Sequence, residues 1–230
     1  MPGASGKPGR DCPLCPRLHA FRHAWRTREP LWFNAPVPCF GVSTARLLIV
    51  GLAPGLRGAN RTGRPFTGDY AGDLLYETLK KYGFATGNYA ARADDALGLI
   101  DARITNAVRC VPPENKPLPA EIRTCRAFLA ATISEMMHLR AIVTLGRIAH
   151  ESTIAALDQR RSAAPFGHGA AQEIGRLRVF ASYHCSRYNT STGVLTAEMF
   201  RAVFAQVRAY LDACSPAITS SALLSGGNTG

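Results

Sequence analysis

Four short runs of apolar, often β-branched residues constrain the fold of this chain more than any other feature. They cover residues 46–51, 103–108, 141–145 and 177–183. Nearly continuous apolar runs of this length are typical of parallel strands that are buried on both faces of a sheet. Apolar residues at helical spacing lie between and after these runs, in residues 73–82, 119–137, 148–157 and 196–213. The alternation predicts an α/β fold of three layers, α/β/α, with a four-stranded parallel sheet in the middle.

The length of 230 residues suits one large α/β domain. We expect that domain to span residues 11–214. Residues 1–10 are rich in Gly and Pro, and residues 215–230 are rich in Ser, Gly and Thr, so we expect both ends to be disordered. The chain has no run of about 18 apolar residues, and its start lacks the apolar stretch of a secretory signal. A cytoplasmic protein is therefore the default expectation.

The formal net charge is +11, and most of the cations are arginines. A basic surface favours a polyanionic partner such as DNA or RNA. The alternative is an Arg-rich and Ala-rich composition that reflects only a GC-rich genome. Charge alone does not separate DNA from RNA, or either of them from an anionic metabolite.

Four of the seven cysteines are spaced as ligands of one metal centre. Cys12 and Cys15 form a C-x-x-C pair, and Cys110 and Cys125 could complete the set. Four thiolates fit a [4Fe-4S] cluster or a Cys₄ zinc site. A zinc ribbon usually repeats the short spacing, so the pattern favours iron-sulfur, while zinc and no metal stay open. Such a centre would be structural, and plain packing is the interpretation for Cys39 and Cys214.

A glycine-rich loop, residues 51–69 (GLAPGLRGANRTGRPFTGD), follows the first apolar run. Its five glycines let the backbone approach a phosphate or a base closely. The loop is neither a Walker A motif nor G-x-G-x-x-G, and an ordinary surface loop is the alternative. It also carries an aromatic ring that could stack on an extruded base, a carboxylate, and cations for phosphates. These residues are Phe66, Asp69, Arg57, Arg61 and Arg64.

Polar or glycine-rich residues follow each of the four predicted strands. The glycine-rich loop follows the first, Asn106 lies near the end of the second, Gly146 follows the third and His184 follows the fourth. Ligands of open α/β sheets bind at the carboxyl ends of the strands. Because four separate segments meet there, we expect the functional site at this edge.

Three segments, with the four cysteines, resemble one known family. GLAPGLRGANRTGRPFTGD, ITNAVRCVPP and HCSRYNTSTG look like the iron-sulfur branch of the uracil-DNA glycosylase superfamily, and most of all like its fifth family, often called type B. The resemblance runs from residue 12 to about residue 210. It implies the uracil-DNA glycosylase-like fold, a [4Fe-4S] cluster held by Cys12, Cys15, Cys110 and Cys125, and a monomer that hydrolyses the N-glycosidic bond without cutting the strand.

Leu52 bears on the substrate. The related fourth family has Glu at this position, and a leucine cannot activate water, so the chain looks more like the fifth family. That family acts on double-stranded DNA and on hypoxanthine and other modified bases as well as uracil. The resemblance therefore implies DNA as the partner, mainly double-stranded and with deaminated bases, and a place in the nucleoid.

The resemblance also implies a role for each matching residue. Asn106 would hydrogen-bond the Watson-Crick edge of the base, and Phe66 would stack on it. His184 would stabilise negative charge on the departing base, and Asp69 would orient water or stabilise a cationic sugar. The expected catalytic residues are His184, Asp69 and Asn106, and the expected base-binding residues are Phe66, Asn106, Leu52 and Ala53. Cys185 stands where the family usually has proline, which affects the geometry of the loop more than the chemistry.

The remaining expected contacts are to the DNA backbone and the duplex. The two residues after the His-Cys-Ser segment could wedge into the gap left by an extruded base. Arginines of the glycine-rich loop and one after the second strand could bind phosphates, although each could equally be an ordinary surface arginine. The expected DNA-binding residues are Arg57, Arg61, Arg64, Arg109, Arg187 and Tyr188.

Three other functions compete with uracil excision. A glycosylase for a different base would share the fold and the cluster. A catalytically silent iron-sulfur module could bind DNA without cutting a bond, although His184 and Asn106 argue against it. A zinc-bearing α/β hydrolase that acts on a nucleotide is the third alternative, which metal analysis would distinguish.

Overall fold

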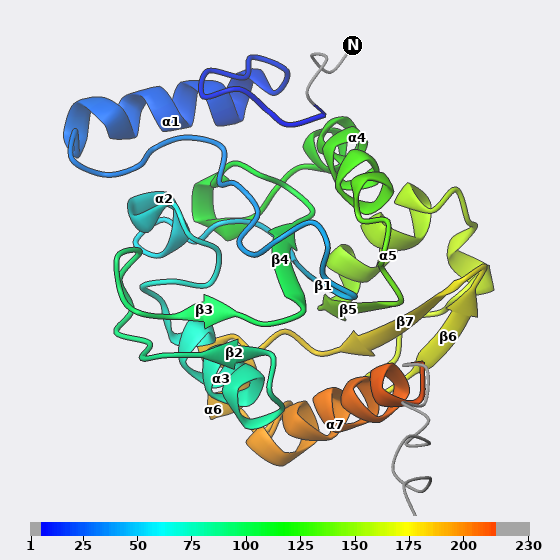
Figure 1. Ribbon diagram of the computed structural model, residues 1–230. Helices are drawn as coiled ribbons and strands as arrows, with labels where there is room; N and C mark the ends of the chain where they lie inside the picture. Colours follow the sequence, from blue (N-terminus) through cyan, green and yellow to red (C-terminus); the bar gives the residue numbers. More distant parts are fainter. Residues whose placement is uncertain (1–5, 215–230) are drawn as a thin grey trace, which may run out of the picture.

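A five-stranded sheet forms the centre of the protein, in the computed structural model that describes residues 6–214 (Figure 1). Its strand order is β4-β1-β5-β7-β6. The first four strands are parallel, as the sequence predicts, and β6 is an antiparallel edge strand. The four-stranded prediction was one strand short, because β6 (AQEI) is half-exposed and has no apolar run. The bounds are β1 Leu47–Gly51, β4 Ala102–Asn106, β5 Ala141–Leu145, β6 Ala171–Ile174 and β7 Leu177–Ser182.

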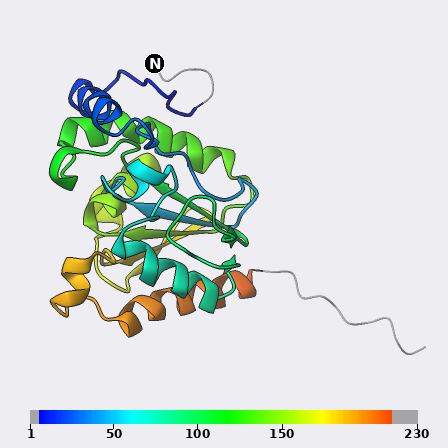
Figure 2. The ribbon, with the colours of Figure 1, turned by 90° about the vertical axis from the view of Figure 1, so that its left-hand side faces the viewer.

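Helices cover both faces of the sheet and complete the predicted three layers (Figures 1 and 2). One face packs against α3 (Tyr70–Lys81) and α7 (Ala197–Ala213) through a large apolar core. The other face packs against α4 (Pro119–Glu135) and α5 (Arg147–Ala156). These are the four predicted helices, with ends that differ by only a few residues. The prediction of a three-layer α/β fold is confirmed.

Several further elements lie outside the three layers and were not predicted. They are α1 (Pro16–Arg28), α2 (Ala59–Thr62), α6 (Arg187–Ser191), the hairpin of β2 (Ala85–Thr86) and β3 (Gly98–Leu99), and 3₁₀ turns at Pro113–Asn115 and Arg161–Ala163. Helix α1 buries only Leu18 and Arg22, so its sequence lacks an apolar stripe. Among residues 6–214, no helix is both long and apolar enough to span a membrane.

The predicted disordered ends lie largely outside the described residues, which exclude 1–5 and 215–230. Residues 6–10 are described, and the carbonyl of Arg10 accepts a hydrogen bond of 2.7 Å from Nη1 of Arg22 in α1.

The parallel strands all end at one edge of the sheet. Helix α2 follows β1 there, and α6 follows β7. Gly51 at the end of β1 pairs with Asn106 at the end of β4. The topology thus brings the glycine-rich loop, Asn106 and the His184 segment to the same edge.

Candidate active site

A cavity of about 530 Å³ opens at this edge. Its wall comes from the loop after β1, the end of β4, the turn after β4 and the segment after β7. The convergence expected from the strand ends is therefore present. Eight residues that the sequence singled out line the cavity: Leu52, Ala53, Arg57, Phe66, Asp69, Asn106, His184 and Arg187.

Asn106 and Phe66 meet at the floor of the cavity, above Gly51. A Cβ atom on Gly51 would stand 2.5 Å from Oδ1 of Asn106 and 2.6 Å from Cζ of Phe66. Only glycine leaves room for both groups at this point. No hydrogen bond joins the Asn106 amide to another side chain or backbone group among residues 6–214, so its donors and its acceptor are left for a ligand.

His184 lies beside Phe66 on the wall of the cavity. The two rings stack with their centroids 6.0 Å apart and their planes 28° apart. Burial lowers the pKa of His184 to about 4, so the imidazole is neutral at neutral pH and can donate one N–H. The main chain here is held by Asn189, whose Nδ2 donates to the His184 carbonyl at 2.8 Å.

Cys185, in the place of the usual proline, points into the core rather than the cavity. It is fully buried, and its Sγ contacts the carbonyl oxygen of Ala71 in α3 at 3.5 Å. Burial raises the pKa of this thiol above its ordinary range. The cysteine thus anchors the loop that carries His184 by packing.

Asp69 lies under the glycine-rich loop at the start of α3. Cβ atoms on Gly55 and Gly58 would stand 2.9 Å and 2.4 Å from its Oδ2, so the loop backbone rests directly on the carboxylate. Its Oδ1 is buried and has no hydrogen-bond partner among the described residues. Burial raises the pKa of the Asp69 carboxyl. The carboxylate is therefore fixed by packing, with one oxygen unpaired.

Arg64 does not face DNA, contrary to the sequence-based expectation. Its guanidinium is buried and forms a two-point ion pair with Asp95, with nitrogen–oxygen distances of 2.7 and 2.8 Å. Its Nε donates to Oγ1 of Thr67 at 2.8 Å. The Arg64 side chain holds the pKa of Asp95 well below its usual range. Arg64 thus shapes the turn at Phe66, whose φ of +52° is unusual for a bulky residue.

Arg109 is likewise inside the protein, so its assignment to DNA was wrong. It is 2% exposed, and its Nη2 donates to Oγ1 of Thr132 at 2.9 Å. Its Nη1 donates to the carbonyl of Val37 at 3.3 Å. The other four expected DNA-binding residues are at the surface: Arg57, Arg61, Arg187 and Tyr188.

Comparison with known proteins decides the family. The uracil DNA glycosylase superfamily matches residues 38–208, which include β1, β4, β7 and every cavity residue named above. The chain belongs to the uracil-DNA glycosylase superfamily. The family expected from the sequence motifs is confirmed.

Relatives in this superfamily cover most of the chain. A type-5 uracil-DNA glycosylase of Thermus thermophilus is 46% identical over 204 residues, covering 86% of this chain and 92% of the relative. One of Mycobacterium tuberculosis is 40% identical over 209 residues, covering 86% and 77%. A type-4 uracil-DNA glycosylase of Archaeoglobus fulgidus is 33% identical over 153 residues, covering 64% and 69%. The chain is thus more similar to these type-5 relatives than to this type-4 relative.

Some cavity residues of this superfamily member were missed from the sequence. Tyr70, half-exposed, follows Asp69 directly, and Ser186 follows Cys185, so both could have been found as neighbours of motif residues. Asn115 also lines the cavity, from a turn in which its φ is +57°. No sequence pattern connects Asn115 to the site, because it reaches the cavity only through the path of the chain after β4.

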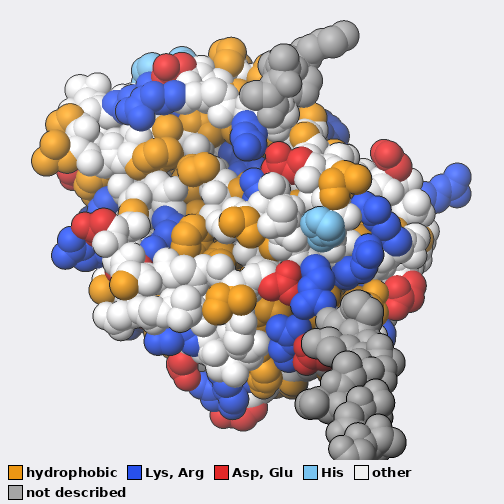
Figure 3. Space-filling view, viewed as in Figure 1, with side chains coloured by type: hydrophobic (Ala, Val, Ile, Leu, Met, Phe, Trp, Pro, Cys, Tyr) orange, Lys and Arg blue, Asp and Glu red, His pale blue; other side chains and the backbone are white. Residues whose placement is uncertain are grey.

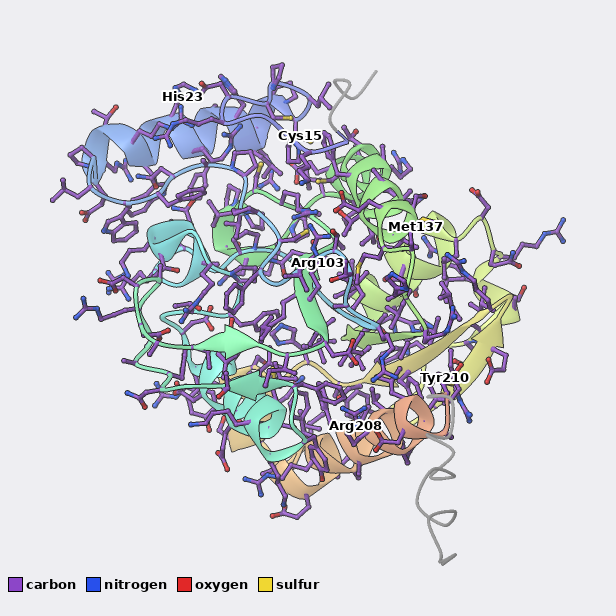
Figure 4. All side chains as sticks on the ribbon, in the orientation of Figure 1. Cys15, His23, Arg103, Met137, Arg208 and Tyr210 are labelled. Atoms are coloured by element: carbon purple, nitrogen blue, oxygen red, sulfur yellow. The ribbon has the colours of Figure 1, made fainter. Side chains whose placement is uncertain are left out.

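The four cysteines of the C-x-x-C pattern line one small apolar pocket between α1 and α4. Cys15, labelled in Figure 4, lies at the start of α1. The backbone N–H of Arg109 points to Sγ of Cys125 at 3.3 Å. Burial raises the pKa of Cys110 to about 12 and that of Cys125 to about 11. Among residues 6–214, no group of three or more His, Cys, Asp or Glu side chains is arranged to hold a metal ion.

Proposed function

We propose that this protein removes uracil from DNA by hydrolysing the N-glycosidic bond, with the cavity at the sheet edge as its active site. The cavity carries the proposal, because it combines unpaired polar groups with an aromatic wall. A base extruded from the duplex needs both, since its faces stack and its edge hydrogen-bonds. The type-5 relatives are named for the same activity.

Asn106 and Phe66 bind the base in this proposal. The amide of Asn106 can donate to one base oxygen and accept from the neighbouring ring N–H, a pairing that uracil offers and cytosine does not. Phe66 provides the stacking surface. Leu52 and Ala53 add apolar lining without a charged group. An apolar lining rejects other deaminated bases only weakly, so we extend the proposal to hypoxanthine.

Bond cleavage sends the bonding electron pair to the base and leaves a cationic, oxocarbenium-like sugar. The neutral imidazole of His184 donates its N–H to the oxygen of the departing base. Asp69 lines the cavity, where its negative charge stabilises the sugar cation or orients the attacking water. Water then adds its oxygen to C1′, and its proton passes to the released base or to solvent. Fixed donors of this kind are each worth about 10² to 10³ in rate.

DNA contacts in this proposal come from exposed residues around the cavity. Arg57 and Arg187 line its rim and lie within reach of phosphates beside the extruded nucleotide. Arg61 extends the same surface, and Tyr188, which is 73% exposed, is the better placed wedge. The face in Figure 3 mixes basic and acidic side chains. We propose a monomer that acts mainly on double-stranded DNA.

A [4Fe-4S] cluster held by Cys12, Cys15, Cys110 and Cys125 completes the proposal. The donors fit this cluster in kind and in place, because four thiols line one apolar pocket and the Arg109 N–H can bond a thiolate, although the side chains are not arranged as metal ligands in the structure. The cluster would tie the segment before α1 to α4 and take no part in the chemistry. About four irons per chain, with acid-labile sulfide, is the expected analysis. Zinc in their place would contradict the cluster.

The test is base release from matched duplexes that carry one uracil, one hypoxanthine or neither. We expect release from the uracil duplex, release from the hypoxanthine duplex at a measurable rate, and none from the undamaged duplex. Intact strands after neutral work-up would support hydrolysis without strand cleavage. Protein with its metal content intact that released no base from any duplex would overturn the proposal in favour of a silent DNA-binding module.

A further inference from the structure

A second pocket, of about 250 Å³, lies beside the active cavity, and its two tryptophans have no role in the proposed function. It is lined by Trp25, Glu29, Trp32, Arg57 and Arg61, and we call it the tryptophan pocket. Arg57 lines both the tryptophan pocket and the active cavity. The two hollows are therefore neighbours on one surface, separated by a single arginine.

Hydrogen bonds fix the wall of the tryptophan pocket to α2. The backbone N–H of Phe33 donates to the carbonyl of Arg61, and that of Asn34 donates to the carbonyl of Asn60, both at 3.0 Å. Nδ2 of Asn60 also donates to Oδ1 of the fully buried Asn34, at 2.8 Å. Figures 1 and 2 show α2 beside the end of α1. The pocket is thus held in shape before any ligand arrives.

The aromatic side of the pocket is flat. The rings of Trp25 and Trp32 stack with their planes 1° apart and their centroids 5.5 Å apart. The guanidinium of Arg28 lies 5.5 Å from the centre of the Trp25 ring. Flat aromatic surfaces of this kind are what single-stranded nucleic-acid sites offer to a base, because every base has a face that can stack.

The cationic side of the pocket is free to bind an anion. Arg57 and Arg61 are exposed, and neither forms an ion pair with an acidic side chain among residues 6–214. Glu29 is the one acidic residue among the five lining residues, against two arginines. Aromatic stacking surfaces next to basic groups that follow the backbone are typical of sites for unpaired nucleotides.

We propose that the tryptophan pocket binds an unpaired nucleotide of the damaged strand, next to the base in the active cavity. Its phosphate lies on Arg57 and Arg61, and its base lies against Trp32. Bases inside a duplex are stacked on each other, so only an unpaired nucleotide offers a face to tryptophan. The inference rests on the proposed function, because that function brings the strand past Arg57. It adds a contact to an unpaired nucleotide beside the damaged base, which a single strand or a frayed duplex end offers.

Tryptophan fluorescence tests the inference directly, because the two tryptophans of the chain both line this pocket. The probes are a uracil-free single-stranded oligonucleotide and the same sequence as a closed duplex. We expect the single strand to quench the fluorescence and the duplex to leave it nearly unchanged. Quenching by neither probe, or equal quenching by both, would overturn the inference.

Variants separate stacking from general weakening. Trp32→Ala should weaken single-strand binding by about 5- to 150-fold and leave duplex binding unchanged. Trp32→Phe should retain most of the affinity, which also controls for misfolding. Leu31→Ala, at the neighbouring residue that is 98% exposed, should change neither. Equal loss for both probes in Trp32→Ala would contradict the assignment.

These binding tests use no damaged base, so they separate the two proposals. Quenching without base release from any substrate would support the tryptophan pocket as a nucleic-acid site and contradict the proposed glycosylase activity. Uracil release without quenching by the single strand would contradict only the inference about the tryptophan pocket.

Discussion

The active cavity and the cysteine pocket are close neighbours that differ in size and in the kind of side chains that line them. Ala53 belongs to both, since it lines the cavity and packs against the cysteine cluster. In the cavity, the side-chain amide of Asn106 has no hydrogen-bond partner among the described residues. Around the cysteines, Arg22 is fully buried, and its Nη1 and Nη2 donate to the carbonyls of Arg10 and Cys12 at 2.7 and 2.8 Å. Its Nε has no partner among the described residues, so the two guanidinium ends hold the segment before α1.

This difference indicates what each region is for. Leaving polar groups unpaired costs free energy of folding, and a protein recovers it when a ligand binds. The cavity therefore suits a molecule that comes and goes. The cysteine pocket, closed and apolar, suits a permanent structural group. Variants of the cysteine pocket should therefore mainly lose stability, and variants of the cavity should mainly lose turnover.

Removing one cysteine should have the largest effect on stability. Cys110→Ser is expected to lower the free energy of unfolding by more than about 4 kcal/mol, because a structural metal centre contributes to folding directly. Denaturant unfolding, with iron analysis alongside, measures this. Cys39→Ser is the matched control and should keep its iron. Full iron content and near-normal stability in Cys110→Ser would remove this cysteine from the ligand set.

Adding one methyl group beneath the cavity should disturb turnover without removing any chemical group. Gly51→Ala forces its Cβ against Asn106 and Phe66, which should cost about 1–3 kcal/mol of stability. We also expect at least a tenfold loss of uracil release, measured in single-turnover assays, because the base-binding groups must move. Gly98→Ala, whose Cβ would stand 3.7 Å from its nearest neighbour, is the control. Similar turnover in both variants would contradict the claim that Asn106 and Phe66 bind the base above Gly51.

Substitutions of two arginines near the cavity should have different effects, one on DNA binding and the other on stability. Arg57→Ala is expected to weaken duplex binding a few-fold and to reduce the salt slope of binding by about one, because an exposed phosphate contact is lost. Its stability should change by no more than about 0.5 kcal/mol. Arg64→Ala should instead destabilise the fold, since Asp95 loses its buried partner. A reversed pattern would mean that Arg64, not Arg57, meets the DNA.

The smallest expected effect concerns pH. The pKa of His184, about 4 in the folded protein, lies below its ordinary value of about 6.5. Its stabilising contribution is therefore complete above pH about 6.5 and is lost as the pH falls towards 4. Between pH 6.5 and 8, protonation of His184 should leave no step in turnover. Unfolding of the wild type and of His184→Gln at several pH values measures how much stability His184 loses at low pH. A step in the wild-type turnover near pH 6.5 that is absent in His184→Gln would contradict the claim that His184 acts as a neutral donor.

The sequence predicted the sheet and the cavity because both depend on patterns along the strands. Apolar runs marked the four parallel strands, and the residues directly after them marked Asn106 and His184. The edge strand β6 and the polar helix α1 were missed, since neither presents an apolar face. The arginines show the limit most plainly. Arg57 and Arg64 lie in one loop, yet one is exposed and the other is buried against Asp95 from a distant segment.

The role of His184 in base release is the central claim, and a single-turnover assay on a uracil duplex tests it most directly. His184→Ala should release uracil about 10² to 10³ times more slowly than the wild type, while its affinity for the duplex stays within a few-fold. His138→Ala, at an exposed histidine away from the cavity, should match the wild type. Unchanged uracil release by His184→Ala would contradict the account.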